Sequence, residues 1–237
     1  MCGRFSNATT PDQLKATFKV QFGDRGKASS GHNAEPRWNI APSLDVDTVI
    51  YAAGQQILRP MTWGIATLKN TRPIINARSE TMFEKPTFRH AARHQRCVLV
   101  ASGWYEWMAP KKPYYISRAD GAPMGFAGLY WQDGNASRCV IVTTAADGAL
   151  ADIHHRAPMV VEEGNMRRWL TGETYAEDGG ALIAPSPAEL FHWQAVSAEV
   201  GSTRSNHSGL IERDDAHGIQ DAPEDEPPPP EPQLSLF

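Results

Sequence analysis

The feature that most constrains the fold of this chain is a series of short apolar runs separated by turns. The turns contain Gly54, Asp120-Gly121 and Asp133-Gly134, which are typical of β-hairpins. The runs that read as strands are Val46–Ala52, Gln56–Met61, Cys97–Ala101, Tyr114–Ser117, Met124–Leu129 and Cys139–Thr144. Many short strands and few helices predict the α+β class, as a single β-rich domain over residues 2–211 with a few short peripheral helices.

The expected helices are short, and the first has the clearest start. Thr10 is a capping residue, Pro11 suits the first turn and Gln13 completes a capping box, so this helix should run to about Phe18. Further helices are expected at Pro86–Arg93, Glu162–Leu170 and Ser186–Phe191. In the first of these, two histidines stand four residues apart, which is a metal-ligand spacing. The stretch lacks the glutamate of a zinc-protease helix, so we expect a solvated or base-facing helix and no metal.

Composition excludes several classes of protein. A chain of 237 residues with 41% hydrophobic residues can bury a sizeable core, and it contains no apolar run long enough to span a membrane. We expect no cleaved leader ahead of Cys2. The three cysteines show no CxxC spacing, which argues against a zinc ribbon or a disulfide framework. Cys97 and Cys139 each open an apolar run, so we expect them to be buried. Free cysteines fit the reducing cytoplasm. We expect the protein to need no cofactor.

The sequence begins Met1-Cys2-Gly3-Arg4-Phe5, and this start carries unusual chemistry. Cys2 is small, so we expect Met1 to be removed, which would leave an α-amino group and a thiol on one residue. An α-amino group titrates near about 7.7–8.0, so part of it is neutral at cellular pH and can attack an aldehyde. The thiol can then close a thiazolidine ring. Taken alone, however, the terminus also fits an ordinary chain end.

Three other sets of polar residues could carry chemistry, and each has an alternative. Glu106 lies among aromatic residues, where its pKa could be raised for acid–base work, or it could point to water. His154 could shuttle protons, but it could also be merely exposed, and His155 could be the functional ring instead. If their segment is extended, Asn76 and Arg78 share a face and could hold a sugar and a phosphate. Otherwise they would serve a turn and a surface ion pair.

Together these residues belong to motifs that resemble one family, the SRAP (SOS-response-associated peptidase-like) proteins, which process abasic sites. The resemblance covers residues 2–211 in the right order, and the combination is specific. The motifs are Met1-Cys2-Gly3-Arg4-Phe5, Trp38-Asn39-Ile40-Ala41-Pro42, Trp63-Gly64, Ile75-Asn76-Ala77-Arg78-Ser79-Glu80-Thr81, Gly103-Trp104-Tyr105-Glu106-Trp107, and Asp152-Ile153-His154 through Pro158.

The resemblance implies a covalent reaction with single-stranded DNA. The family crosslinks its N-terminal cysteine to the ring-opened aldehyde of an abasic site, giving a thiazolidine that shields the lesion. Cys2 would be the nucleophile and Asn76 would position the sugar and the amine. Glu106 would be the acid–base group for ring opening and imine formation, and His154 would help to open the sugar and to reverse the crosslink. The residues expected to line the DNA path are Arg4, Asn39 and Arg78.

The resemblance also implies a monomer associated with the nucleoid, and the chain departs from the family at two places. The family often carries wedge-like aromatic residues after Trp63-Gly64, where this chain has a stretch that contains Lys69. Base stacking there is in doubt, and Lys69 is expected to contribute charge to DNA binding instead. The position after His154 is often acidic in the family, whereas here it is His155.

Other functions remain open from the sequence. An N-terminal-cysteine glutamine amidotransferase also begins Cys-Gly, but the Asn-Gly-Glu-like signals that would hold glutamine are missing. A non-covalent single-strand binder would have equal affinity for intact and abasic strands. A peptidase that acts on other proteins is the third alternative, although removal of Met1 is the only cleavage that the motif requires.

The C-terminal residues 212–237 differ from the rest of the chain. They contain eight acidic residues and one arginine, a net charge of −7, which leaves +3 for residues 1–211. Acid and proline dominate as far as Pro232, so we expect a disordered linker. It ends in an apolar pentapeptide that resembles the motif by which bacterial DNA-polymerase partners dock on the sliding clamp. The residues expected to bind the clamp are Gln233, Leu234, Leu236 and Phe237.

Overall fold

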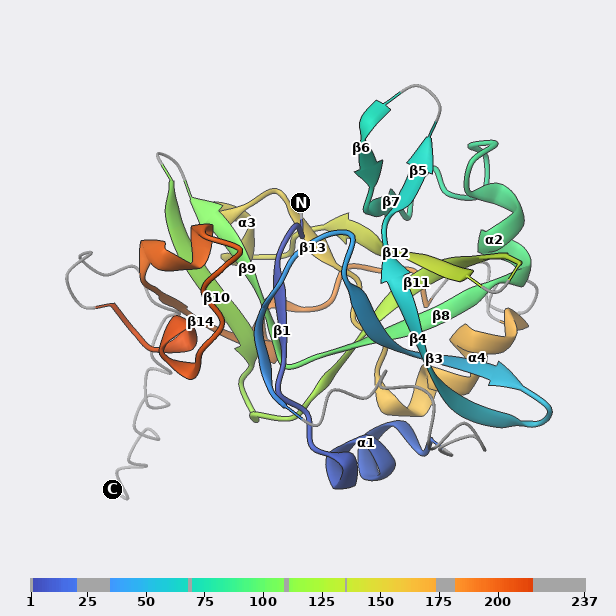
Figure 1. Ribbon diagram of the computed structural model, residues 1–237, viewed down its shortest axis with the longest axis horizontal. Helices are drawn as coiled ribbons and strands as arrows, with labels where there is room; N and C mark the ends of the chain where they lie inside the picture. Colours follow the sequence, from blue (N-terminus) through green and yellow to red (C-terminus); the bar gives the residue numbers. More distant parts are fainter. Residues whose placement is uncertain are drawn as a thin grey trace, which may run out of the picture.

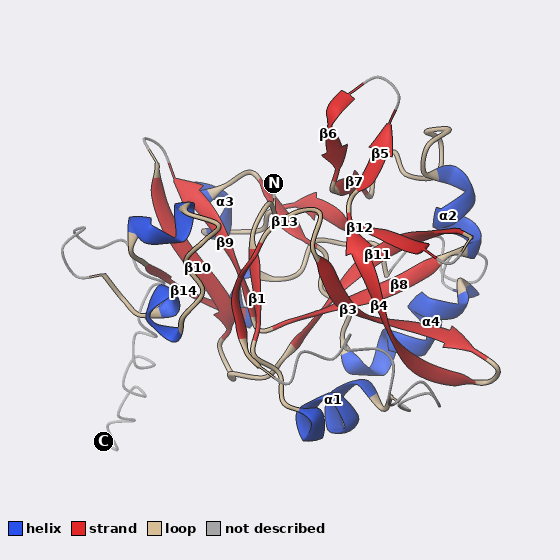
Figure 2. Cartoon of the chain, in the orientation of Figure 1, coloured by secondary structure: helices blue, strands red, loops and turns tan. Residues whose placement is uncertain are grey.

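The computed structural model describes residues 2–20, 35–67, 70–108, 111–134, 136–173 and 182–214. It confirms a β-rich α+β fold with a few short helices, built from two large β-sheets and a projecting hairpin (Figure 1). Figure 2 shows that the helices lie at the periphery of the strands. Among these described ranges, no helix is long and apolar enough to cross a membrane.

The first sheet is antiparallel and has five strands. Its order is β14 (Phe191–Ala195), β10 (Lys112–Arg118), β9 (Gly103–Met108), β1 (Phe5–Asn7) and β2 (Arg37–Ile40). The N-terminal strand β1 is therefore an interior strand, held between β9 and β2. A Cβ atom at Gly103 would lie 2.3 Å from Cζ of Tyr115, so this close packing of β9 on β10 requires glycine at that position.

The second sheet curls until its ends meet. Its path runs β11 (Met124–Asp133), β8 (Arg96–Ala101), β3 (Asp45–Ala52), β4 (Gln55–Trp63), β12 (Ala136–Ala145) and β13 (Arg156–Pro158), with β7 (Asn76–Arg78) also paired to β12. Because β12 pairs with β11 as well, five of these strands form a closed ring. The last part of β12 lies between β7 and β13, which brings two distant segments of the chain together.

The remaining elements surround the two sheets. A small hairpin of β5 (Ile65–Thr67) and β6 (Asn70–Ile74) projects from the second sheet (Figure 1). The helices are α1 (Pro11–Phe18), α2 (Arg89–His94), α3 (Leu150–Ile153) and α4 (Met166–Thr171), with single 3₁₀ turns at Glu163–Asn165, Ala188–Leu190, Ala198–Gly201 and Ser208–Ile211.

Aromatic side chains fill the space between the two sheets. Phe5 packs edge-on against Trp63 and Phe126, with ring centroids 5.1 and 6.0 Å apart, and Trp104 meets Phe126 at 5.9 Å. Cys2 belongs to this buried cluster. A second cluster packs one side of the closed sheet against α1, α2 and α4. The N-terminal segment is thus anchored in the core by Phe5, which fixes the position of the residues before it.

Most of the elements expected from the sequence are present. The Thr10 capping box starts α1, and the six expected strands are all found, several of them longer than expected. The free cysteines Cys97 and Cys139 are buried, as expected. The proposed linker beyond Asp214, with its clamp motif, and Lys69 lie outside the described residues.

Two helix predictions need correction. The prediction of a helix at Ser186–Phe191 was wrong: only Ala188–Leu190 form one 3₁₀ turn, and Phe191 begins β14, whose alternate side chains are buried. The helix expected at Pro86–Arg93 is α2, which starts later, at Arg89. The residues before it form turns, in which the N–H of Phe88 donates to the carbonyl of Lys85.

Candidate active site

The site is built around Cys2, which precedes β1 and packs in the core cluster with side chains of both sheets. Figure 1 shows the N-terminal end of the chain leading into β1. The pairing of β1 with β9 places Phe5 opposite Trp104, and the N–H of Tyr105 donates to the carbonyl of Arg4 over 3.0 Å. Cys2 has no exposed surface. Burial raises the pKa of its thiol well above the ordinary value, and the nearby charge of Glu106 raises it further, so this thiol keeps its proton.

Asn76 holds the backbone of Cys2 from the second sheet. Its Nδ2 donates to the Cys2 carbonyl over 2.9 Å. Parallel pairing with β12 keeps β7 extended, so Asn76 and Arg78 lie on one face of this strand, as expected. The amide oxygen of Asn76 is buried and accepts no hydrogen bond within the described part of the chain. A buried acceptor of this kind is available to a substrate hydroxyl or amine.

Glu106 is buried on β9, with 4% of its surface exposed, which rules out the alternative in which it points to water. Burial raises the pKa of its carboxyl to about 7 against the opposing effect of the amino-terminal charge and a hydrogen bond to that amine. A carboxyl with a pKa near 7 can both donate and accept protons at cellular pH. Burial is thus the cause of the raised pKa, as the aromatic residues around Glu106 in the sequence suggested.

His154 is half-buried and directly follows α3. Its Nδ1 lies 3.0 Å from the backbone nitrogen of Arg156 and 3.1 Å from the backbone oxygen of the same residue. The neutral ring can accept from that N–H, and the protonated ring can donate to that carbonyl. Burial lowers the pKa of His154, and the charge of the amino terminus lowers it further, so the ring is mostly neutral at pH 7.

The three groups are linked by one charge. The amino-terminal charge shifts the pKa of the Cys2 thiol, of Glu106 and of His154, all in the downward direction. Glu106 also raises the pKa of the Cys2 thiol, and Asn76 contacts the Cys2 carbonyl directly. Cys2, Asn76, Glu106 and His154, which come from four separate segments of the sequence, are thus related by one hydrogen bond and by these electrostatic effects.

Arg156 is a residue that the sequence analysis did not single out. Its guanidinium is nearly buried and binds both carboxylate oxygens of Glu80, at 2.5 and 3.0 Å. It also contacts the backbone oxygen and the hydroxyl of Thr143 on β12. This pair joins the segment of Asn76 to the segment of His154. The signal available in the sequence was that Glu80 follows Asn76 closely and Arg156 follows His154.

His155 and the residues expected to contact DNA occupy different environments. His155 stacks on His154, with ring centroids 4.4 Å apart. Arg78 is exposed at the end of β7. Arg4 is half-buried and donates to Asn39 over 2.7 Å. The Asn39 side chain is buried and also donates to three backbone carbonyls between residues 200 and 205, so its hydrogen bonds go to the protein itself.

The described residues contain no cluster of three or more potential metal ligands. His90 and His94 lie on the exposed face of α2, with ring centroids 5.1 Å apart.

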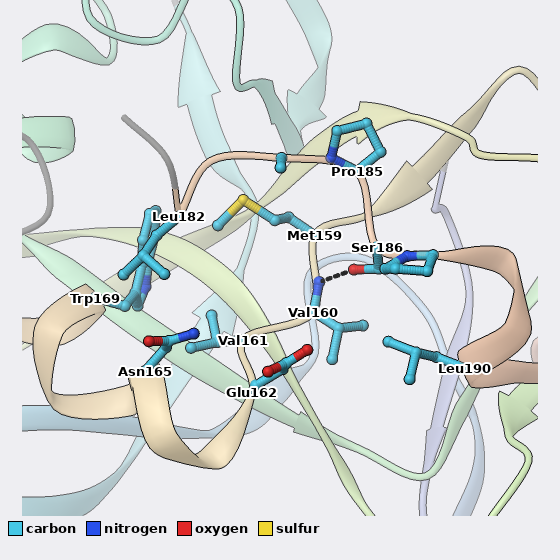
Figure 3. A pocket seen from close by; sticks show the side chains of 12 residues that line it. Met159, Val160, Val161, Glu162, Asn165, Trp169, Leu182, Pro185, Ser186 and Leu190 are labelled. Atoms are coloured by element: carbon cyan, nitrogen blue, oxygen red, sulfur yellow. Dashed lines mark hydrogen bonds between the residues drawn. The ribbon is translucent and has the colours of Figure 1, made fainter. Parts of the chain in front are cut away.

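A pocket of about 140 Å³ lies elsewhere, between the segment after β13 and the segment around Pro185 (Figure 3). Met159, Trp169 and Leu182 line it, and the N–H of Val160 donates to the hydroxyl of Ser186 over 3.2 Å. None of the residues around Cys2 contributes to this pocket.

Comparisons with known proteins point to one family. The family model for the SOS response associated peptidase (SRAP) matches residues 1–203. Abasic site processing protein YedK of Escherichia coli is 32% identical over 90% of this chain and 99% of its own length, and protein YoqW of Bacillus subtilis is 32% identical with the same coverage. A crystal structure of a Bacteroides thetaiotaomicron protein shares the fold, with a TM-score of 0.74, 20% identity and coverage of 90% of this chain and 100% of the other.

Proposed function

Because this chain belongs to the SOS response associated peptidase (SRAP) family, we propose that it recognises abasic sites in single-stranded DNA and crosslinks to them covalently through Cys2. The observation that carries the proposal is the setting of Cys2. Its carbonyl is fixed by Asn76, and its amino-terminal surroundings contain a carboxyl with a pKa near 7 and a neutral imidazole. The two relatives that match this chain over nearly their whole length are named abasic site processing proteins.

The proposed reaction begins when Met1 is removed, by autocatalysis or by an aminopeptidase, so that the α-amino group belongs to Cys2. The neutral amine attacks the aldehyde carbon of the ring-opened sugar and forms a carbinolamine. Loss of water gives an imine. The thiol sulfur then bonds to the imine carbon while its proton passes to the nitrogen, which closes the thiazolidine. Burial keeps the thiol protonated, which favours this order, with the amine attacking first.

The acid–base roles follow from the two environments. Glu106 assists ring opening of the sugar and gives a proton to the oxygen that leaves as water. His154 helps to open the sugar and to reverse the crosslink, because its ring finds a backbone partner in both protonation states. Asn76 orients the sugar and the amine through its buried amide oxygen. Holding the aldehyde beside the amine supplies much of the acceleration, because effective molarities can reach about 10⁵ M or more.

The residues proposed to bind DNA are Arg4, Asn39, Arg78 and Lys69. For Lys69, which lies outside the described residues, the proposal rests on the sequence alone. Arg78 is the exposed cation on the same strand as Asn76, which suits it to a phosphate beside the abasic nucleotide. Asn39 would act through Arg4, because its side-chain oxygen accepts a hydrogen bond from Nη1 of Arg4. Affinity for single strands should therefore fall steeply with salt, and Arg78→Ala should reduce the salt slope by about one phosphate contact.

The test is a denaturing gel with three oligonucleotides: an abasic strand, an intact strand and a strand with a tetrahydrofuran abasic analogue that has no aldehyde. Only the true abasic strand should give a band that survives denaturation. Cys97→Ala and Cys139→Ala should keep this band, and Cys2→Ala should lose the stable product. Equal retention of intact and abasic strands without a covalent product would favour a non-covalent binder. Release of ammonia from glutamine would favour the amidotransferase alternative.

A second proposal concerns the last five residues and rests on the sequence alone. We propose that Gln233–Phe237 docks on the replication sliding clamp and holds the protein near stalled replication, where abasic single strands arise. A peptide ending in these residues should bind the clamp with micromolar affinity. Deletion of the pentapeptide should abolish clamp binding and leave crosslinking of a free oligonucleotide unchanged. A full-length chain that shows no clamp association in a calorimetric titration would contradict this proposal.

A further inference from the structure

Tyr114 lies directly opposite Glu106 in the first sheet. The two residues are register partners on the antiparallel strands β10 and β9, and both are buried. Such partners project to the same face, with Cβ atoms about 4.5–5.5 Å apart. Tyr114 belongs to the apolar cluster that contains Cys2, whereas its neighbours Tyr105 and Tyr115 belong to the cluster on the opposite face of the sheet.

The hydroxyl group of Tyr114 has no hydrogen-bond partner in the part of the chain that the structure describes, although it is buried. The other two tyrosines of this strand pair are satisfied. Tyr115 shares a hydrogen bond with the hydroxyl of Ser6 at 2.9 Å, and Tyr105 donates to the carbonyl of Trp38 over 2.7 Å. A buried hydroxyl without a partner destabilises the fold, and phenylalanine would fill the same space without that cost. The unpaired hydroxyl is the one on the face of Cys2 and Glu106.

We propose that Tyr114 is a further catalytic residue, whose hydroxyl donates a hydrogen bond to the oxygen that leaves the aldehyde carbon of the substrate. This inference rests on the proposed function. In the carbinolamine, that oxygen takes a proton from Glu106, the C–O bond breaks with release of water, and the nitrogen lone pair forms the C=N bond. The nitrogen then returns a proton to the carboxylate of Glu106. Tyr114 transfers no proton: its hydrogen bond stabilises the negative charge that develops on this oxygen earlier, while the amine adds to the carbonyl.

Asn76 supplies the complementary group. Its buried amide oxygen is an acceptor without a partner among the described residues, and the hydroxyl of Tyr114 is a donor in the same condition. One ligand with both a donor and an acceptor, such as a carbinolamine, would satisfy the two. The indole N–H of Trp104 is also unpaired in the described structure, but its ring is clamped between Phe126 and Phe191, so we assign it no such role.

Tyr114→Phe tests the proposal, and Tyr115→Phe is the matched control. Single-turnover crosslinking of an abasic oligonucleotide should slow by about 10-fold in Tyr114→Phe. Its affinity for the tetrahydrofuran analogue should stay close to that of the wild type, and its melting temperature should be equal or higher, because no satisfied hydrogen bond is lost. Tyr115→Phe should melt at a lower temperature, since it loses the bond to Ser6, yet it should crosslink at the wild-type rate.

Two results would overturn the assignment. A wild-type rate in Tyr114→Phe would show that the hydroxyl does not touch the reacting atoms. An equal slowing in both variants would show that the effect is structural. Both results are distinct from failure of the proposed function, in which the wild-type chain itself forms no crosslink and the inference falls with it.

Discussion

Glu106 and His154 are the two acid–base candidates of the site, and the fold places them in opposite settings. Glu106 projects from the middle of a sheet into the core, so burial dominates and raises the pKa of a group that would otherwise be charged. His154 lies half-buried in a loop, where burial lowers its pKa and backbone atoms serve both ring states. In both cases burial disfavours the charged form, so near pH 7 Glu106 populates both protonation states and the His154 ring is mostly neutral.

Glu106→Gln should have the largest effect. The amide fills the same space but cannot transfer a proton, so the rate of crosslinking should fall by about 10²-fold or more. The matched control is Asp47→Asn, because Asp47 is also buried and burial also raises its pKa to about 7, but its partner is the side chain of Asn7. Single-turnover rates from gel densitometry would measure both. If Asp47→Asn slowed the reaction as much, loss of a buried carboxyl in general would explain the result.

His154→Ala should slow release from a preformed crosslink by a comparable factor of about 10². The reason is that reversal needs a group that returns a proton to the thiazolidine, and the loop ring is the one with partners in both states. The exposed His192 on β14 provides a control, since His192→Ala should release at the wild-type rate. Chase of the crosslinked protein with excess competitor aldehyde would give the rates.

The raised pKa of Glu106 predicts a specific dependence of stability on pH. The folded chain keeps this proton up to about pH 7, whereas the unfolded chain loses it near about pH 4.3. Between these values the folded state binds more protons, so stability should fall as the pH rises, by on the order of 3–4 kcal/mol. Asp47 should behave in the same way. Melting temperatures from pH 5 to pH 8 should fall less steeply in Glu106→Gln and in Asp47→Asn, and parallel curves would contradict the buried-acid assignment.

Glu80→Gln should have a smaller effect, because it weakens the pair that joins the two halves of the site without removing a reacting group. We expect reversal to slow by about 3- to 10-fold. The cost in stability should be about 1 kcal/mol or less, since half of the Glu80 side chain is exposed. The exposed pair of Arg118 and Asp120 is a control, and Asp120→Asn should leave reversal unchanged.

His155→Ala should have the smallest effect, below about 3-fold on reversal. The ring stacks on His154, and within the described part of the chain it is His154 that makes the ring contacts with the backbone of Arg156. Comparison of the two alanine variants under the same conditions would measure the difference. If His155 proved the more sensitive position, the roles of the two rings in this loop would be exchanged.

The sequence predicted the local features of the site well. The capping box of α1 and the buried strand β8 follow from neighbouring residues, whereas for Glu106 the sequence left a buried and a water-facing orientation open. The 3₁₀ turn before β14 was mistaken for a helix, because Pro187 and the polar residues beside it resemble the start of a helix. The pairing of Phe191 with Arg118, which makes this segment a strand, cannot be seen from the neighbouring sequence. Long-range partners decide such cases.

Contacts between distant segments were the part that sequence could not give. The sequence places Glu80 close to Asn76 and Arg156 close to His154, but it does not show that Glu80 and Arg156 pair, because that contact depends on β12 lying between β7 and β13. Likewise, Asn39 was expected to line the DNA path, and its hydrogen bonds to the segment between residues 200 and 205, which bury it, are not visible in the sequence. The unpaired hydroxyl of Tyr114 becomes visible only when every buried polar atom has been placed.

The most direct test of the central claim is intact mass spectrometry of the purified protein mixed with an abasic oligonucleotide. We predict one new species, with the mass of the chain without Met1 plus the oligonucleotide less one water, since an aldehyde and an aminothiol lose one water on forming a thiazolidine. Cys2→Ala should not give this stable species, although borohydride could trap an imine. A wild-type chain that stays unmodified, or a stable adduct that persists in Cys2→Ala, would contradict the account.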